Sequence, residues 1–362
     1  MMNLRYLLAF AAARCGFPDS WLRLSIDRTL ELRARALVPA SATASHFAAW
    51  MAGQPEAAAA GTTTMLPAAF YETFLGPQMH LGRGIYGSGR ETLMAAEQAA
   101  LHDACDRAML ANGQEILDLG CGWGAMTLLM AETYPAAHIT ALAQSRQQYE
   151  YVQAQTAARG LQNVTVVLSS IADFEPVLAF DRVVCLDMFS QQTNWRAALT
   201  QLRAWMTRGG RMFLQVPTHI TTPYCLDAAD TLGGAAPGIP GRRIIASQGL
   251  IREFGDLFTV AAEQHYSGTH MARTALQWLE NFDRNHEKAA KLLRTAYGAQ
   301  APAWQRHWRL FFLSMAQMHS HAFGDVWGVG QYVLTPQRNS ATVATAAARG
   351  EAAFLRHELK SA

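Results

Sequence analysis

The feature that most restricts the fold of this chain is the stretch EILDLGCGWGAMT, which covers residues 115–127. A strand-like run ends in an aspartate, a turn with three glycines follows, and the chain continues as an apolar, helix-like run. The aspartate is Asp118, and the three glycines are Gly120, Gly122 and Gly124. Glycines at a strand-to-helix turn let backbone N–H groups approach a ligand, and the helix adds the free N–H groups of its first turn. The stretch therefore predicts a ligand site between a strand and a helix.

Short apolar runs alternate with amphipathic runs around this turn. Strands are expected in EILDLG, HITALA, NVTVVLS, DRVVCLDM and GRMFLQV, with helices between most of them, and VWGVGQYVLTP reads as a returning strand. Strands that alternate with helices are typical of a parallel sheet covered by helices on both faces. We therefore predict an α/β fold with a doubly wound, Rossmann-like sheet.

Composition narrows the class of partner and the location. The 362 residues carry a formal charge of +2 and only 16% of them are charged, so we expect a small or amphipathic partner and no nucleic acid. The five cysteines are scattered, which predicts neither a zinc site nor a disulfide framework and fits a reducing cytoplasm. Arginines interrupt the apolar run at residues 1–17, so soluble helices are expected there instead of a signal sequence, and no transmembrane segment is predicted.

The residues beside the glycines indicate which ligand the turn holds. A carboxylate at Asp118 would receive an ammonium group but would repel a pyrophosphate, and Ala125 replaces the third glycine of a dinucleotide fingerprint. The alternative is a tight turn without a ligand. The sequence DLGCGWG resembles the first motif of class I S-adenosylmethionine-dependent methyltransferases, which implies S-adenosyl-L-methionine as the cofactor.

The second predicted strand points to one branch of those enzymes. It ends in ALAQSRQQ, without the usual acidic residue, and resembles the Ser-x-x-Gln signature of the cyclopropane-fatty-acid synthase and coclaurine N-methyltransferase superfamily. This resemblance implies a seven-stranded class I methyltransferase sheet with an N-terminal helical lid and a helical cap. The cofactor-binding residues that it implies are Asp118, Gly120, Gly122, Gly124, Gln144, Gln148 and Ile171.

The resemblance covers the chain from about Phe70 onward and suggests its division into parts. Residues 1–64 are expected to form an N-terminal helical segment and linker, and 65–340 the methyltransferase domain, with the helical cap at about 218–320. Residues 341–362 are expected to form a C-terminal helical tail. The ending, with YG, WRLFF and GDVW, is similar to that of the plant coclaurine N-methyltransferases, which favours the methyltransferase branch over the cyclopropane branch.

Departures from the family pattern bear on the chemistry. Cyclopropane synthases of the family hold a bicarbonate base with a Cys, a Glu, a His and a Tyr, and this chain has Arg83, Ser190, Gln215 and Met271 at the matching positions. Cyclopropanation is therefore not expected, unless Arg83 binds an anion in a different arrangement.

Two residues remain as candidates for catalysis by resemblance to the amine methyltransferases. Asp187, in LDMFSQQ, survives where Ser190 and Gln191 replace the family's Glu and His, and it would take the proton from an amine. It would alternatively stabilise a cationic group or bond a backbone amide. His219 follows a predicted strand and is a second candidate base, with a capping histidine as the alternative.

The predicted substrate pocket contains seven side chains. They are Arg83, Tyr86, Ser190, Gln191, Gln215, His270 and Met271. His319 and His321 have the spacing of a metal-ligand pair but lack a third ligand nearby in the sequence, so no metal site is predicted.

The function that we expect is S-adenosylmethionine-dependent N-methylation of a small amine, of the tetrahydroisoquinoline type. One alternative is C-methylation of an unsaturated fatty acyl chain of a phospholipid, with peripheral contact to a membrane surface. Another is a chain that binds the cofactor without transferring a methyl group. A homodimer is the suggested oligomeric state.

Overall fold

The computed structural model describes residues 18–37, 44–55, 65–226 and 243–337. Within these ranges nine strands form one sheet with the order β3-β2-β1-β4-β5-β7-β6, while β9 pairs with β5 and β8 pairs with β9. The strands are β1 (Glu115–Leu119), β2 (His138–Ala143), β3 (Val164–Leu168), β4 (Phe180–Leu186), β5 (Met206–His219), β6 (Tyr224–Leu226), β7 (Arg243–Ser247), β8 (Phe258–Tyr266) and β9 (Trp327–Pro336).

The first five strands pair in parallel, and β9 runs antiparallel between β5 and β8. The predicted α/β class and doubly wound sheet are therefore confirmed. The expected number of seven strands is wrong, because β6 and β7 form an additional antiparallel pair. Strand β7 joins β5 at Thr218 and His219, beyond the last residue pair between β4 and β5, and so prolongs the sheet past the end of β4.

Ten α-helices are described. They are α2 (Asp19–Leu37), α3 (Ala44–Ala52), α4 (Ala68–Tyr71), α5 (Leu93–Ala108), α6 (Ala125–Thr133), α7 (Arg146–Ala158), α8 (Trp195–Trp205), α9 (Gly268–Arg284), α10 (His286–Tyr297) and α11 (Ala301–Ser320). Side chains define several starts: the Thr92 hydroxyl accepts the Ala95 N–H ahead of α5, and the Asn194 side chain accepts the Ala197 N–H ahead of α8. Such caps fix the residue at which each of these two helices begins.

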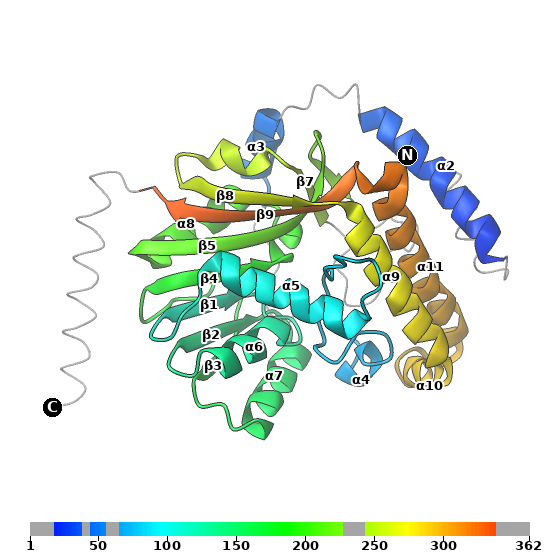
Figure 1. The fold of residues 1–362 in the computed structure, drawn as a ribbon, viewed down its shortest axis with the longest axis horizontal. Helices are drawn as coiled ribbons and strands as arrows, with labels where there is room; N and C mark the ends of the chain where they lie inside the picture. Colours follow the sequence, from blue (N-terminus) through cyan, green and yellow to red (C-terminus); the bar gives the residue numbers. More distant parts are fainter. Residues whose placement is uncertain (1–17, 38–43, 56–64, 227–242, 338–362) are drawn as a thin grey trace.

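Helices α9, α10 and α11 form the cap beside one end of the sheet, and α2 runs along α11 (Figure 1). The range 218–320, expected to be a helical cap, also contains β6, β7 and β8, so its first part belongs to the sheet. Arg309 of α11 holds α2 in place by ion pairs with both Asp19 and Asp283. The N-terminal helix α2 therefore packs on the cap.

The segment that packs against the glycine turn is the one around α4. Tyr71 and Trp123 lie with ring centroids 4.8 Å apart, and both belong to the hydrophobic cluster that also contains Trp278 and Trp308 of the cap. Cap, α4 segment and glycine turn therefore share one core.

Parts of the sequence predictions lie outside the described residues. They are the helices at 1–17, most of the linker before residue 65 and the C-terminal tail at 341–362. In the described ranges, no helix is long and apolar enough to cross a membrane.

Candidate active site

The glycine turn joins β1 to α6, and its backbone explains the three glycines. Gly120, Gly122 and Gly124 have φ angles of +81°, +55° and +84°, in the left-handed region that side chains disfavour. A Cβ at Gly120 would lie 2.7 Å from the Met188 side chain, and one at Gly124 would lie 2.9 Å from Val152. A Cβ at Gly122 would meet no atom of the described residues within 4 Å. The turn is thus packed at its two ends and open at its centre.

Asp118, ahead of this turn, is buried and already hydrogen-bonded. The Thr127 hydroxyl, in the first part of α6, donates to Asp118 Oδ2 over 2.5 Å. Burial raises the pKa of the Asp118 carboxyl to about 6, although its hydrogen bonds with Thr127 act in the opposite direction. The carboxylate therefore ties the end of β1 to the start of α6.

The loops after β2 and β3 lie at the same edge of the sheet. After β2, the half-buried Gln144 precedes Ser145, whose hydroxyl oxygen accepts the N–H of Gln148 and caps α7. After β3, the Ser170 hydroxyl donates to Asp173 Oδ2 over 2.6 Å, and Ile171 is buried in the core. The carboxyl ends of β1, β2 and β3 thus bring together the residues predicted to bind the cofactor.

Asp187 follows β4 and adopts a left-handed conformation with φ +63°. Its N–H donates to Gln215 O of the adjacent strand β5 over 2.9 Å. The Gln215 side chain donates from Nε2 to Asp187 Oδ2 over 3.3 Å, and Gln331 Nε2 of β9 donates to Gln215 Oε1 over 3.0 Å. Three neighbouring segments of the sheet therefore fix the orientation of one half-buried carboxylate.

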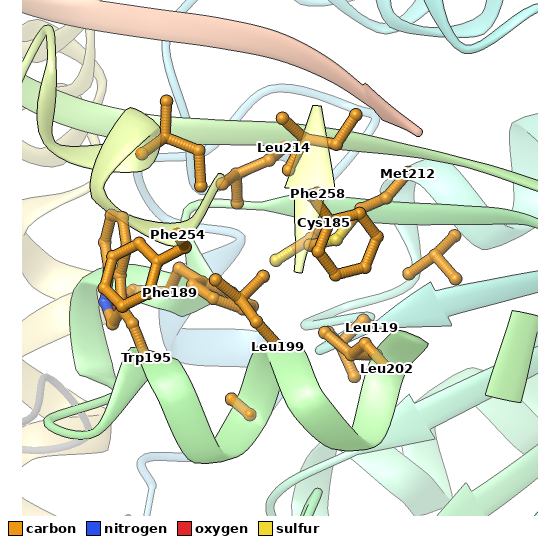
Figure 2. Close-up of a cluster of buried hydrophobic side chains, with 14 of the residues drawn as sticks. Leu119, Cys185, Phe189, Trp195, Leu199, Leu202, Met212, Leu214, Phe254 and Phe258 are labelled. Atoms are coloured by element: carbon orange, nitrogen blue, oxygen red, sulfur yellow. The ribbon is translucent and has the colours of Figure 1, made fainter. Parts of the chain in front are cut away.

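The core beneath Asp187 holds this turn in place. Figure 2 shows Phe189 beside Trp195 and Phe254, and the ring centroids of Phe189 and Trp195 are 5.3 Å apart. Trp195 Nε1 donates to Phe189 O over 2.9 Å, while the Ser190 hydroxyl donates back to Asp187 O over 2.7 Å. Ser190 thus stabilises the turn that carries the aspartate.

The Asp187 turn and the glycine turn contact each other. Met188, the next residue along, is the side chain that a Cβ at Gly120 would strike. The predicted cofactor turn and the predicted catalytic acid are therefore direct neighbours, as parallel strands β1 and β4 require.

Buried charges surround Asp187. Burial raises the pKa of the Asp187 carboxyl to about 6, against the opposing effects of the Arg243 and Arg83 guanidinium groups and of the Gln215 hydrogen bond. Arg243 is the first residue of β7, so the additional strand pair brings this cation to the end of β4.

The segment 80–86 lies between Asp187 and the cap. A Cβ at Gly82 would lie 2.5 Å from His80 Nε2 and 3.3 Å from Asp187 Oδ2, so both groups contact the same point of the backbone. Burial, together with the nearby Arg83 cation, lowers the pKa of His80 to about 4. The imidazole beside Asp187 is consequently neutral at neutral pH.

Helix α9 holds the other side of this segment. The Gly84 N–H donates to Thr274 Oγ1 over 2.9 Å. The Tyr86 N–H donates to His270 Nδ1 over 3.1 Å, and the Tyr86 hydroxyl donates to Gln277 Oε1 over 2.7 Å. Because His270 Nδ1 accepts a hydrogen bond, its proton is on Nε2 in the neutral form.

Arg83 is fully buried, yet its guanidinium lacks hydrogen bonds. The Arg83 Cζ lies 3.7 Å from the centroid of the Tyr266 ring, and Arg83 Nη2 lies 3.9 Å from Asp103 Oδ2. In the described part of the chain, Nε, Nη1 and Nη2 have no hydrogen-bond partner. A buried cation with unbonded N–H groups is energetically costly unless a further partner binds it.

The remaining predicted residues are His219, Met271 and Gln191. His219 Nδ1 accepts the N–H groups of Thr221 and Thr222 over 3.2 and 3.0 Å, and its ring packs against Trp327. Met271 is buried in the core of the cap, and Gln191 is the half-buried last residue of the short helical turn after Asp187. A base role for His219 would require Nδ1 to give up both hydrogen bonds, either to take the proton itself or to carry the ring proton so that Nε2 can accept one.

Sequence reasoning missed three side chains around Asp187 and Arg83. They are His80, Arg243 and Gln331. His80 stands three residues before Arg83 in MHLGRG and was within reach of the same argument, whereas only the pairing of β7 and β9 with β5 shows where Arg243 and Gln331 lie. In the described ranges, no three His, Cys, Asp or Glu residues form a group that could hold a metal ion.

Comparison with known proteins places these features in context. Residues 65–327 match the family described as mycolic acid cyclopropane synthetase. The chain is 31% identical to (S)-coclaurine N-methyltransferase of Thalictrum flavum subsp. glaucum over 241 residues, 65% of this chain and 67% of that protein. It is 34% identical to the cyclopropane-fatty-acyl-phospholipid synthase of Escherichia coli K12 over 104 residues, 29% of this chain and 26% of the synthase.

A solved structure extends the likeness to almost the whole chain. Coclaurine N-methyltransferase bound to N-methylheliamine and SAH superimposes with a TM-score of 0.83 and 25% identity, over 93% of this chain and 100% of that one.

Proposed function

The chain belongs to the mycolic acid cyclopropane synthetase family and is an S-adenosylmethionine-dependent methyltransferase, and from this premise we propose that it N-methylates a small amine. Support comes from the extent of the match to (S)-coclaurine N-methyltransferase, which is more than twice that of the match to the cyclopropane synthase. We propose a tetrahydroisoquinoline-type amine as the acceptor class.

The glycine turn fits this cofactor. Gly122 faces open space where any larger residue would place a Cβ, and the turn leads directly into the N-terminus of α6. The residues that would hold the cofactor are Asp118, Gly120, Gly122, Gly124, Gln144, Gln148 and Ile171. When bound, S-adenosylmethionine supplies an electrophilic methyl group.

Asp187 is the residue that we propose as the catalytic acceptor of the proton. Its ionised carboxylate would accept a hydrogen bond from the amine N–H and direct the nitrogen lone pair away from itself, and would take the proton as the nitrogen gains its methyl group. A pKa of about 6 keeps Asp187 ionised at neutral pH and makes it a stronger base than an exposed aspartate. The observation that carries this proposal is the contact between the Asp187 turn, through Met188, and Gly120.

His219 is proposed to be a positioning residue. Its two hydrogen bonds from the backbone of Thr221 and Thr222 hold the chain where β5 ends, close to Trp327 of β9. Arg83, Tyr86, Ser190, Gln191, Gln215, His270 and Met271 remain the proposed surroundings of the acceptor.

Transfer of a labelled methyl group tests the function. We expect mass spectrometry to detect a gain of one methyl group on a tetrahydroisoquinoline within a panel of small amines, and none on vesicles of unsaturated phospholipid. Gly122→Val, which fills the open centre of the turn, should abolish both transfer and binding of S-adenosylhomocysteine. Label found only in lipid would replace the proposal with acyl C-methylation; cofactor binding without transfer to any acceptor would reject both.

Location and assembly stay predictions. We propose a cytoplasmic protein, which fits the four free cysteines in the described ranges, Cys105, Cys121, Cys185 and Cys225. Peripheral membrane contact and a homodimer are likewise part of the proposal.

A further inference from the structure

The guanidinium of Arg83 is a buried charged group for which the proposed methyl transfer supplies no partner. Its side chain has no exposed surface, and its three nitrogens have no hydrogen-bond partner in the described ranges. Burial of such a group is costly, and a planar oxyanion is the partner that satisfies several of its N–H groups at once.

The nearby carboxylates do not supply that partner. Asp103 Oδ1 already accepts from Arg107 Nε over 2.9 Å, and Asp103 Oδ2 accepts from the Tyr266 hydroxyl over 3.0 Å. Arg83 Nη2 lies 3.9 Å from the same oxygen, which is too far for a hydrogen bond. The Tyr266 ring covers one face of the guanidinium and leaves its edge, where the N–H groups lie, unoccupied by protein acceptors.

Among the described residues, the charges around Arg83 also leave an excess of one cation. Arg83, Arg107 and Arg243 interact with Asp103 and Asp187, which gives three guanidinium groups against two carboxylates. His80 and His270, which also face Arg83, both have lowered pKa values and add no charge at neutral pH. One further negative charge would balance the cluster.

The position of Arg83 connects it to the acceptor. Gly82, its neighbour in the chain, lies beside the Asp187 carboxylate, whose Oδ2 would be 3.3 Å from a Cβ at Gly82, and the Asp187 turn adjoins the glycine turn through Met188. We propose that the acceptor amine also carries a carboxylate, which Arg83 binds while Asp187 accepts from the amine N–H. This inference rests on the proposed N-methyltransferase function and specifies its substrate class as amino acids or similar zwitterionic amines.

Binding measurements test this without turnover. Calorimetry in the presence of S-adenosylhomocysteine would compare three acids, tetrahydroisoquinoline-3-carboxylate, phenylalanine and proline, with their carboxamides, which have the same shape but no negative charge. We expect at least one acid to bind roughly 10- to 100-fold more tightly than its amide, as for a charge-assisted bond. Equal affinity in all three pairs would overturn the proposal.

Variants identify the responsible side chain. Arg83→Met should reduce the preference for the acid to about one, while Arg211→Met, on the part of β5 that pairs with the start of β4, should keep it. Removal of a buried charge whose N–H groups lack hydrogen bonds in the described ranges should leave the melting temperature of the free protein unchanged or higher, so loss of binding would not reflect unfolding. A preference that survives in Arg83→Met would contradict the proposal.

Turnover separates this inference from the proposed function. A methylated plain amine with no gain for its acid would reject the carboxylate and keep the N-methyltransferase. Acids that bind through Arg83 but are never methylated would keep the carboxylate site and reject the N-methyltransferase function. If sodium acetate or bicarbonate accelerates methylation of the plain amine in the wild type and not in Arg83→Met, the anion is a separate ion and the acceptor carboxylate is overturned.

Discussion

The two halves of the site differ in how their polar groups are satisfied. At the glycine turn, Asp118 is bonded by Thr127 only nine residues away, and the positive φ angles of the glycines set the shape of the backbone. Around Asp187, by contrast, hydrogen bonds join Gln215, 28 residues away, and Gln331, a further 116 residues along, while the Arg83 guanidinium has none among the described residues.

This difference indicates how the two halves work. The cofactor half is a local backbone shape, completed before any ligand arrives, and its hydrogen bonds are internal. The acceptor half, around Asp187 and Arg83, is an electrostatic arrangement that includes a buried charge without hydrogen-bond partners. Charge that is oriented in advance in this way stabilises a developing cation or anion. The comparison predicts that changes of charge harm the acceptor half alone and that changes of backbone shape harm the cofactor half.

The largest expected effect is on catalysis at Asp187. Asp187→Asn keeps the size of the side chain but removes the base, so kcat/KM for the amine should fall roughly 10²- to 10⁴-fold. Binding of S-adenosylhomocysteine, measured by calorimetry, should not change. Asp181→Asn, at the opposite end of β4, is the matched control, since its carboxylate accepts from the Glu115 N–H and the Thr207 hydroxyl, away from the site.

The proposed role of Asp187 also predicts how kcat/KM depends on pH. Because only the ionised form of Asp187 accepts the proton, and its pKa is raised to about 6, kcat/KM should fall as the pH decreases through about 6 and level off above it. The Asn variant should lack this limb. If the decrease in kcat/KM near pH 6 persists in Asp187→Asn, another group, such as Asp118, causes it, and the contrast between the two halves does not hold.

Gly120→Ala tests the cofactor half and should have the next largest effect. The new Cβ would meet Met188 at 2.7 Å and would have to adopt φ +81°, so the affinity for S-adenosylhomocysteine should fall roughly ten- to hundredfold. Gly113→Ala is the matched control, with the same φ of +81° and open space around its Cβ.

Both glycine variants should lose stability in urea, but only Gly120→Ala should lose cofactor affinity. If Gly120→Ala instead lowered kcat and left cofactor affinity intact, the displaced Met188 would be acting through Asp187, and the two halves would be one coupled unit.

The smallest expected effect concerns Gln331, which supports Asp187 through Gln215. Gln331→Leu removes one buried hydrogen bond, so kcat/KM should fall about two- to tenfold. The limb near pH 6 should move upward, because a less firmly held Gln215 amide lowers the pKa of Asp187 less. Thr335→Val, farther along β9, should change neither quantity. If the pH at which kcat/KM falls is unchanged in Gln331→Leu, Gln331 contributes only packing and does not act on the pKa of Asp187.

Much of the cofactor half was predictable because its constraints are local. The glycines at 120, 122 and 124 stand between a strand and a helix, and the backbone of that turn requires φ angles that favour glycine. The alternation of strands and helices likewise predicted the α/β class. Strands β6, β7 and β8 were missed. Strands β6 and β7 have three and five residues beside a Gly- and Pro-rich stretch, and all residues of β8 but one are exposed or half-buried, so none of them leaves a clear apolar periodicity.

The acceptor half was predictable only in part. Asp187 follows directly from the strand that precedes it, but the hydrogen bonds from Gly84 to Thr274 and from Tyr86 to His270 join residues 190 and 184 positions apart. Nothing in the local pattern shows that the aromatic face over Arg83 belongs to Tyr266, or that Arg243 lies near Asp187.

The sequence by itself determined the turn, the order of the parallel strands and the edge at which ligands bind, because glycine conformations and apolar periodicity act over a few residues. Only the tertiary structure decided which charges face one another, since the Coulomb energy of a buried group depends on distances in space and on exclusion of water. The unsatisfied guanidinium of Arg83, and with it the substrate class proposed here, arises at that second level.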